Sequence, residues 1–522
     1  MLRTHWTGSA LGLVALLGCA CGAPENSGPD LILTSGRIYA SAETTEPVAA
    51  MAIAGDRVVG LGTDAQIRSL ATDFTQEMDL NGAPVLPGFH DAWIDLEAVG
   101  RRADMLDLTR TAARREVQAR LRAVAAGGTG WIVGWGWDET VWPGGQVPDR
   151  SLLDGIVDAR PVLLYRRIGA VAWLNGPALE LTGMAERTLK DAGGDPTGLL
   201  TGDALRHAET MLPAATSEQR RAWIVTGLQA AAAAGFTSVT SAPLDQEAAE
   251  LLAELAQTGE LPIRVDARLR TATRRPNRSG ADDNFRISAI GLEVDGPLAL
   301  RLAAVSAPYA DAPGAAPPTP NSALAAACDR AAELELPLDT HLRGDAAIEA
   351  VGRCGTAIDG LVVGADILPP GGEVSARRIA IVPHRLAHDL YWLADRVGSR
   401  RASESHAYRD LARAGKLVAL ATRAPAFPLD PMGALWIMNR RQDLQGYPLD
   451  GWSSPQRLSV RDSVRIALGD RLLGPRSLEA YNKADLVVWS ADPFDEEAQL
   501  ADAQAMVVLV DGRVIFSRPA SP

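Results

Sequence analysis

The chain has 522 residues, of which 47% are hydrophobic, so it can bury a large core and is expected to hold more than one domain. Its formal net charge of −13 argues against nucleic acid as a partner. The acidic residues are spread along the chain and form no run, which is typical of a solvated acidic surface.

Residues 1–22 are similar to a bacterial lipoprotein signal peptide. Arg3 precedes an apolar stretch that is too short to span a bilayer, and the stretch ends in Leu16-Leu17-Gly18-Cys19. The resemblance implies that Cys19 is acylated, so that the chain is lipid-anchored in the bacterial cell envelope without spanning the membrane. Ala20 rather than an aspartate follows Cys19, which favours the outer membrane and the periplasm. The alternative is an ordinary cleaved signal peptide that contains a chance cysteine.

Two of the four cysteines lie in this signal region, which leaves Cys328 and Cys354 in the folded body. In an oxidising envelope they could form a disulfide. Two buried free thiols are an equal alternative.

Strand-like segments occur at both ends of the chain. The first are Leu31–Ala40 and Val48–Gly62, with turns at Gly36 and at Gly55-Asp56. The last are Ala484–Trp489 and Met506–Phe516, with a turn at Asp511-Gly512. We therefore expect one small β-sandwich domain built from both chain termini, residues 30–85 and 478–517.

Between these ends, apolar strand-like runs alternate with helical stretches, as in a parallel α/β barrel. Thr216–Ala234 is a predicted helix and Phe236–Thr240 a predicted strand, and the same alternation recurs later in the chain (Leu324–Leu334, Leu338–His341, Asp345–Val351, Leu411–Ala414, Leu417–Thr422). Residues 86–477 are thus predicted to form a TIM (β/α)8 barrel. Residues of about 100–210 fit the alternation poorly and are rich in tryptophan, so we expect an insertion over the barrel mouth whose tryptophans mainly pack.

The stretch Val85–Leu96, VLPGFHDAWIDL, ends an apolar run in Pro-Gly-Phe and then places polar side chains at alternate positions. It resembles the first barrel strand of the amidohydrolase superfamily, in which PGFxDxHxH carries two metal-binding histidines. Six further segments support a branch that includes N-substituted formamide deformylases (Gly134–Gly145, Leu164–Asn175, Asp195–Leu200, Gly235–Ala242, Thr340–Ile348, Ala424–Met432). The resemblance implies a barrel with a sandwich, and metal-assisted hydrolysis of non-peptide C–N bonds.

The ligand positions of that family are substituted in this chain. Trp93 and Asp95 stand at the two histidine positions of the first strand, and Gly291 stands where a lysine is usual. Gly-His-Ala reads Gly169-Ala170-Val171, and Arg-Ile-Glu-His-Ala falls on Ala357–Leu361 with Gly360 in the histidine place. Gln-Pro-x-His becomes Val382-Pro383-His384-Arg385, with Arg385 in the histidine place, and Ser-Asp-Ala-Pro becomes Thr422-Arg423-Ala424-Pro425. Only His341 keeps its residue type.

These substitutions predict a site without a metal or other cofactor, although the family would use zinc or another divalent ion. One imidazole cannot hold zinc, which takes about three protein ligands, and Arg423 brings a permanent positive charge to the place of the cation. Because Asp95 and Arg423 inherit two convergent positions, we expect them to form an ion pair in place of the ion.

Three functional hypotheses follow. The first is a catalytically inactive amidohydrolase-family lipoprotein that keeps a pocket for a small anionic or carbonyl-bearing ligand, lined by His90, Trp93, Asp95, His341, Arg385 and Arg423. The second is a functional hydrolase of non-peptide C–N bonds. It would use a relocated metal site of His90, Asp95 and His341, or His341 with Asp95 or Asp339 as a general base. The third is partner binding through the tryptophan-rich insertion.

Overall fold

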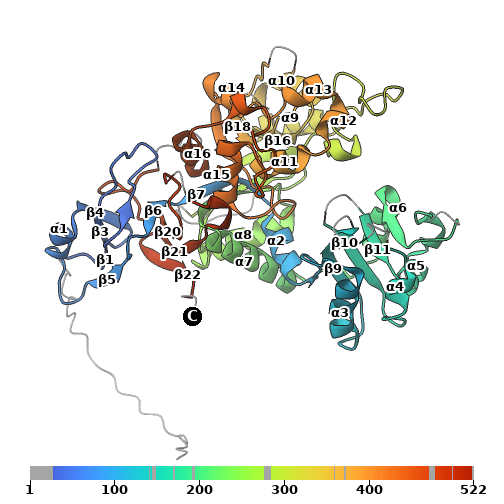
Figure 1. Cartoon of the computed structure of the whole chain (residues 1–522), viewed down its shortest axis with the longest axis horizontal. Helices are drawn as coiled ribbons and strands as arrows, with labels where there is room; N and C mark the ends of the chain where they lie inside the picture. The colour runs from blue at the N-terminus through green and yellow to red at the C-terminus, as the bar shows by residue number, and fades with distance from the viewer. Residues whose placement is uncertain are drawn as a thin grey trace, which may run out of the picture.

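The structure is a computed structural model that describes residues 28–139, 142–143, 148–167, 171–190, 194–274, 284–357, 359–369, 372–469, 476–495 and 498–519. Three parts follow one another across Figure 1: a sandwich of two sheets, a central barrel and the insertion. The predicted lipidation site Cys19 and the motif residues Gly169 and Ala170 lie outside the described residues.

The centre is a barrel of eight parallel strands in the order β19-β18-β17-β16-β15-β14-β13-β7. The strands are β7 (Phe89–Ile94), β13 (Phe236–Ser241), β14 (Arg264–Leu269), β15 (Phe285–Glu293), β16 (Leu338–Leu342), β17 (Leu361–Gly364), β18 (Arg378–Ile381) and β19 (Leu417–Leu420). The chain just after β19 completes the ring, because the amide of Arg423 donates to the carbonyl of Trp93 on β7 at 3.0 Å. The predicted TIM barrel is confirmed.

Helices cover the barrel and also occur in the other two parts. They are α1 (Asp64–Arg68), α2 (Leu96–Ala103), α3 (Arg114–Ala125), α4 (Ser151–Asp154), α5 (Gly176–Thr182), α6 (Gly202–Glu209), α7 (Ser217–Ala233), α8 (Gln246–Gln257), α9 (Leu324–Glu333), α10 (Asp345–Gly352), α11 (Pro383–Asp389), α12 (Leu393–Val397), α13 (Ser399–Ser403), α14 (Tyr408–Arg413), α15 (Pro431–Arg440) and α16 (Val460–Leu468). Among the described residues, no helix is long and apolar enough to cross a membrane.

Helix α7 illustrates how local sequence sets these elements. The hydroxyl of Thr216 accepts from the amide of Gln219, and the side chain of Gln219 accepts from the amide of Thr216, so both ends of a capping box are present. The helix packs closely against α2, because each helix has a glycine at the crossing, Gly227 on α7 and Gly100 on α2. A Cβ at Gly227 would lie 2.0 Å from the carbonyl oxygen of Leu96. A larger residue there would push the helices apart.

Both chain ends build the sandwich, as the terminal segments predict. One sheet has the order β4-β3-β1-β5 and the other β2-β6-β20-β21-β22. Their strands are β1 (Leu31–Thr34), β2 (Arg37–Ile38), β3 (Ala50–Ala54), β4 (Arg57–Gly62), β5 (Gln76–Asp79), β6 (Pro84–Pro87), β20 (Leu486–Trp489), β21 (Ala505–Val510) and β22 (Arg513–Ser517). Leu33 and Met51 of one sheet share a buried cluster with Val85, Leu486 and Leu509 of the other, so the two sheets pack face to face.

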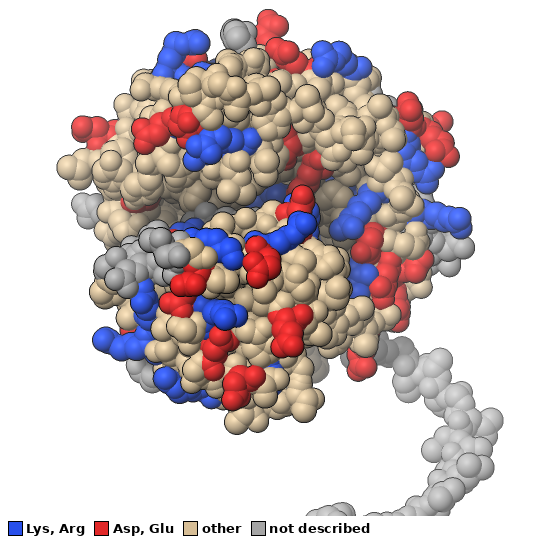
Figure 2. Space-filling model, turned by 90° about the vertical axis from the view of Figure 1, so that its right-hand side faces the viewer, with Lys and Arg blue, Asp and Glu red and all other residues tan. Residues whose placement is uncertain are grey.

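The insertion has its own sheet, in the order β12-β11-β10-β9-β8, and its own core. Its strands are β8 (Leu106–Asp107), β9 (Ile132–Trp137), β10 (Val162–Arg166), β11 (Val171–Leu174) and β12 (Leu199–Thr201). Trp137 and Trp142 are buried in that core, as expected for packing side chains. The guanidinium of Arg102 lies 4.0 Å from the Trp135 ring and donates to the carbonyl of Pro425, which connects the insertion to the barrel mouth. Figure 2 shows mixed charge on this side of the molecule and a hollow across it.

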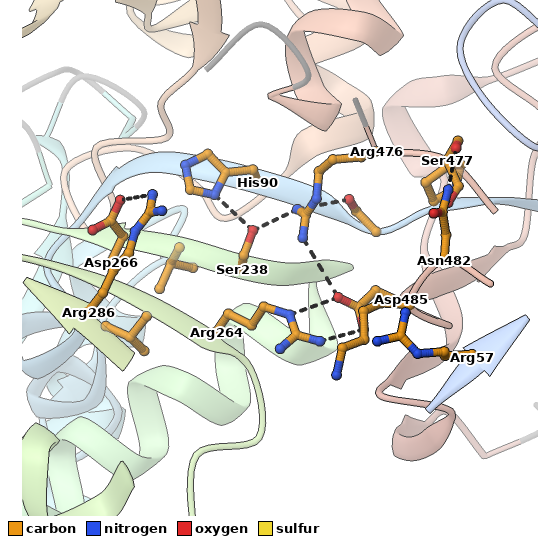
Figure 3. Close-up of a pocket in the computed structure, with 15 residues that line it drawn as sticks. Arg57, His90, Ser238, Arg264, Asp266, Arg286, Arg476, Ser477, Asn482 and Asp485 are labelled. Atoms are coloured by element: carbon orange, nitrogen blue, oxygen red, sulfur yellow. Dashed lines mark hydrogen bonds and ion pairs between the residues drawn. The ribbon is translucent and has the colours of Figure 1, made fainter. Parts of the chain in front are cut away.

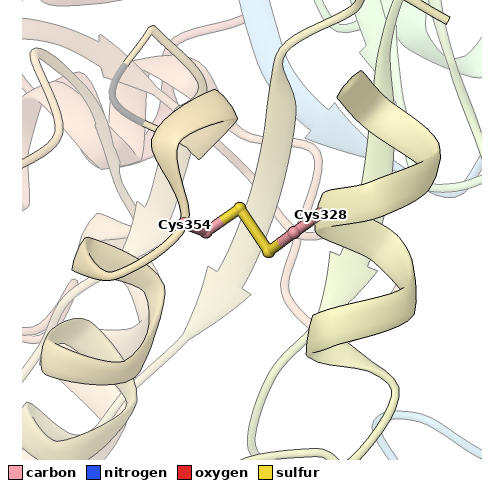
Figure 4. Close-up of a disulfide and its surroundings, with 2 residues drawn as sticks. All are labelled: Cys328 and Cys354. Atoms are coloured by element: carbon pink, nitrogen blue, oxygen red, sulfur yellow. A yellow bond between two sulfur atoms is a disulfide. The ribbon is translucent and has the colours of Figure 1, made fainter. Parts of the chain in front are cut away.

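A disulfide joins Cys328 on α9 to Cys354, two residues beyond the end of α10 (Figure 4). The Cα atoms are 6.0 Å apart, within the usual range for such a bridge. Of the two alternatives left open by the sequence, the structure has the paired one.

Candidate functional site

The indole of Trp93 fills the inside of the barrel near the carboxyl ends of its strands. Trp93 is 0% exposed and packs among small and branched apolar side chains from the facing strands β17, β18 and β19 and the residues that follow them (Leu361, Val363, Ala380, Val382, Ala419, Ala421). The spacing of two along each strand shows that these residues share the inner face. The barrel interior is therefore closed by an aromatic ring at this level.

Two guanidinium groups lie against that ring. The central carbon of Arg268 is 4.7 Å from the Trp93 ring centroid, and that of Arg423 is 5.5 Å from it. The His341 ring is 5.9 Å away. Cation–π attraction holds each guanidinium to the indole face, and each also pairs with a carboxylate, Arg268 with Asp339 and Arg423 with Glu293.

His341 is hydrogen-bonded to an arginine. The Nη2 group of Arg385 lies 2.8 Å from Nε2 of His341. A guanidinium can only donate, so Nε2 is the acceptor and the neutral ring carries its hydrogen on Nδ1. Burial and the charges of Arg423 and Arg385 hold the pKa of His341 well below its usual value. The lone pair that a metal would need is already occupied.

The predicted ion pair between Asp95 and Arg423 is wrong. Arg423 Nη1 pairs instead with Glu293 Oε1 at 3.0 Å, while Asp95 accepts from the amide of Ala98 and caps helix α2. Burial raises the pKa of Asp95, and the charge of Arg423 offsets this only in part. Asp95 starts the helix directly after its strand, so its carboxylate turns to the helix amides rather than across the mouth.

Asp91 lies two residues before Trp93 on β7 and joins this strand to the chain that follows β19. Its Oδ1 accepts from the amides of Trp93 at 3.0 Å and Thr422 at 2.9 Å, and its Oδ2 accepts from the Thr422 hydroxyl. Burial nevertheless raises its pKa to about 6, against these hydrogen bonds. The sequence shows Asp91 in a buried strand but does not reveal its partner, 331 residues away.

The sequence does not predict the buried network of charges that lies next to His341. Arg343 donates to both Asp366 and Asp389, and Arg385 Nη1 donates to Asp366 Oδ2 at 3.0 Å. The ring of His406 lies between the two carboxylates, 3.4 Å from Asp366 and 3.3 Å from Asp389. Burial raises the pKa of each carboxyl, but the arginines outweigh it and hold both pKa values below the usual range. A sequence signal exists, because Arg343 directly follows the apolar strand β16 and Asp366 comes two residues after the end of β17.

The relocated metal site is not formed. Nδ1 of His90 lies 2.8 Å from the Ser238 hydroxyl and its Nε2 lies 3.1 Å from the Thr240 hydroxyl, so both nitrogens bond to strand β13. Asp95 and His341 have the separate partners described above. Across the part of the chain that the structure describes, no group of three or more His, Cys, Asp or Glu side chains is placed to hold a metal ion.

The general base of the second hypothesis is not assembled either. Asp339 accepts from Arg268 Nε at 2.7 Å and from the amide of Leu361 at 2.7 Å, so both of its oxygens are occupied. His341 has no carboxylate partner within hydrogen-bond reach, since its acceptor nitrogen bonds to Arg385. His384 lies apart from this cluster, with Nε2 3.4 Å from Asp430.

A family model described as "Amidohydrolase family" matches residues 76–516 of the chain. The chain belongs to the amidohydrolase family. The protein LONG AFTER FAR-RED 3 of Arabidopsis thaliana is 25% identical over 93% of this chain and 91% of its own length. The putative amidohydrolase YtcJ of Bacillus subtilis (strain 168) is 24% identical over 92% and 98%, and the N-substituted formamide deformylase of Arthrobacter pascens is 23% identical over 45% and 46%.

Solved structures resemble this amidohydrolase in fold. An uncharacterized metal-dependent hydrolase from Pyrococcus horikoshii OT3 superposes with a TM-score of 0.74 at 24% identity, covering 90% of this chain and 99% of that one. A second one from Pyrococcus furiosus gives 0.69 at 24% identity, with 89% and 100% covered. These likenesses support the barrel with its added sheets.

The amidohydrolase motif on β17 lies four residues later than the sequence suggests. Gly360 precedes the strand, whereas Gly364 is at its carboxyl end and pairs in register with Leu342, next to His341. Ligands in a barrel project from carboxyl ends, so Gly364 stands in the place of the second barrel histidine. Its φ of +104° and a virtual Cβ 2.2 Å from the Leu342 carbonyl oxygen exclude a side chain there.

Other side chains occupy the room that the lost amidohydrolase ligands leave. Nη1 of Arg385 is 3.0 Å from a virtual Cβ at Gly364, and Cγ of Pro243 is 2.6 Å from one at Gly291, where a lysine is usual. With Arg423 in the last-strand position, three guanidiniums surround His341 and Trp93. These residues do not fit a divalent cation, because their charge repels it and the histidine nitrogen is already bonded.

Proposed function

We propose that this amidohydrolase-family protein binds a small anionic or carbonyl-bearing ligand at its barrel mouth and does not hydrolyse it through a metal ion. The observation that carries the proposal is the hydrogen bond from Arg385 to Nε2 of His341, since it replaces metal coordination with a fixed positive charge. A hydrolase of the family type needs an ion to lower the pKa of water, and the residues here favour an anion instead.

Unpaired donors support the choice of ligand. Trp93 Nε1, His341 Nδ1 and Arg423 Nε are all buried without a hydrogen-bond acceptor. Buried donors of this kind are costly when unpaired and are rare in native proteins. A carbonyl or carboxylate oxygen that reaches these side chains would satisfy them. Glu293, which now pairs with Arg423, is 56% exposed and can be displaced by a stronger anion.

The competing proposal is a functional hydrolase of non-peptide C–N bonds with a metal bound elsewhere. We expect protein expressed with zinc, manganese and iron to carry far less than one metal ion per chain by elemental analysis, and to turn over no N-formyl or N-acyl amide. Stoichiometric metal that is lost in His341→Ala, together with turnover, would establish the hydrolase and refute our proposal.

The same preparation tests ligand binding by calorimetry, with benzoate as the anionic probe and N-formylbenzylamine as the neutral carbonyl probe. Arg423→Gln should weaken benzoate binding about tenfold, the usual value of one charged hydrogen bond. Arg301→Gln removes an arginine that pairs with Asp311 outside the site, and it should change nothing; Arg301 is 43% exposed, against 17% for Arg423. Equal binding to both variants would place the ligand elsewhere.

We further propose that the protein is a lipoprotein of the cell envelope, anchored through Cys19. The support is the signal-like N-terminus and the Cys328–Cys354 disulfide, because disulfides persist in oxidising compartments. Labelled palmitate should be incorporated into the wild-type chain and the protein should fractionate with outer membranes. Cys19→Ser should abolish both. Unchanged labelling of that variant would show that Cys19 is not the anchor.

A further inference from the structure

A cavity of about 400 Å³ lies at the amino-terminal end of the barrel, opposite the mouth (Figure 3). The start of β7 near Gly88, Ser238 of β13 and the first residues of β14 line one side of it. The segment from Arg476 to Asp485 and Arg57 of the sandwich line the other. Its volume is in the range of small-molecule sites, and it is separate from the mouth described above.

Basic side chains dominate the lining. Five of them face the cavity (Arg57, Arg264, Arg286, Arg476, Lys483), against two carboxylates, Asp266 and Asp485. Asp56 and Asp511 also pair with these bases, through Lys483 at 2.6 and 2.8 Å. Even with those two counted, five positive charges meet four negative ones, on a protein whose net charge is −13. The cavity is thus a local basic site on an acidic protein.

Two of the bases already bind carboxylates of the protein, in the way that an added oxyanion would be held. Arg264 binds Asp485 through Nε at 3.0 Å and Nη2 at 3.1 Å, and Arg286 Nη2 binds Asp266 Oδ2 at 2.7 Å. Both arginines line the cavity, from the neighbouring strands β14 and β15 (Figure 3). The planar guanidinium matches the paired oxygens of carboxylates and phosphates.

A chain of hydrogen bonds fixes a third base at the cavity. Arg476 Nη1 donates to the Ser238 hydroxyl at 2.7 Å, and that hydroxyl lies 2.8 Å from His90 Nδ1. Burial, then the charges of Arg476, Arg268 and Arg286, hold the pKa of His90 well below its usual value. His90 therefore stays neutral and helps to hold Arg476 in place through the Ser238 hydroxyl.

We propose that this cavity binds a small oxyanion with two or more negative charges, either a phosphate compound or a polycarboxylate. The bases supply the charge, and the volume admits a molecule of this size. The alternative is that these ion pairs serve only to join the barrel to the sandwich. Added anions would then have no binding site.

Calorimetry on the full chain tests the proposal with pyrophosphate and citrate as probes. We expect at least one of them to bind with a dissociation constant below about 1 mM at low salt, and binding to weaken as sodium chloride is added. Pyrophosphate alone would indicate a phosphate ligand, and citrate alone a polycarboxylate. No binding of either anion would overturn the proposal.

Matched variants separate this cavity from the rest of the surface. Arg57 and Arg286 are 50% and 59% exposed, so Arg57→Gln and Arg286→Gln should fold normally and weaken binding by about tenfold each. Arg68→Gln is the control, since Arg68 is 45% exposed and pairs with Glu77 elsewhere on the sandwich. It should bind as the wild type does.

A gain of affinity provides the reverse test. Asp266→Asn removes the carboxylate that occupies Arg286, so the added anion should bind several times more tightly. Binding that persists in both arginine variants but is lost in Arg423→Gln would place the anion at the barrel mouth and overturn this inference. It would leave the proposal for the mouth intact.

Discussion

Three arginines place fixed guanidinium groups at the barrel mouth. Arg268 and Arg385 are paired with buried aspartates, and Arg423, three residues beyond the last strand, is paired with Glu293. Of these three carboxylate partners only Glu293 is exposed, at 56%. The proposed anionic ligand would therefore compete with Glu293 for Arg423, while the other two arginines stay paired.

Trp93→Ala tests whether the mouth is packed around the indole. The substitution should lower the free energy of unfolding by about 3–5 kcal/mol, because it leaves a cavity among apolar side chains and removes the ring face from Arg268 and Arg423. Urea unfolding measures the loss. Trp93→Phe keeps an aromatic face and should cost less than half as much. A loss below about 1 kcal/mol for Trp93→Ala would show that the side chain is not a packed core residue.

At the scale of elements, local patterns predict most of the fold. Helix α7 matches the predicted span because Thr216 and Gln219 cap it, and β13 and β16 match because apolar runs between helices leave few alternatives. The two ends of the chain each predict half of one sandwich. The barrel and sandwich therefore follow from sequence periodicity, turn residues and the stated resemblance.

Side-chain partners and strand register are harder to predict from the sequence, because they depend on distances in space. The sequence before Gly360 matches the family motif because it has an isoleucine followed by an acidic residue. Only the strand pairing shows that Gly364 lies beside His341. Asp95 carries the charge expected for pairing with Arg423, yet the start of α2 offers it a nearer donor. The Arg343–Asp366–Asp389 network joins three successive barrel units. The sequence shows that charged residues follow β16 and β17, but not that they pair with one another.

At the scale of the whole molecule, titration of buried groups makes stability depend on pH in opposing ways. Asp91 and Asp295 have pKa values raised to about 6 by burial, so near pH 5 the folded chain binds protons that the unfolded chain has released. Their contribution to stability falls as pH rises from about 4 to 6. His90 and His341 have pKa values lowered by burial, so their contribution falls as pH drops below the usual value of 6.5. Between pH 4 and 6 the two pairs act against each other.

Asp91→Asn isolates one of these contributions. The amide can keep the hydrogen bonds to Trp93 and Thr422 but does not titrate, while the histidines titrate alike in both proteins and cancel in the difference. The stability of wild type relative to Asp91→Asn should fall by about 2 kcal/mol between pH 4 and 6, out of about 3 kcal/mol for the whole shift of about two pKa units, and should level off above about pH 7. Urea unfolding at half-unit steps measures this difference. A difference for Asp91→Asn that is flat, or that rises with pH, would mean that the carboxylate is ionised in the folded barrel and that its three hydrogen bonds outweigh its burial.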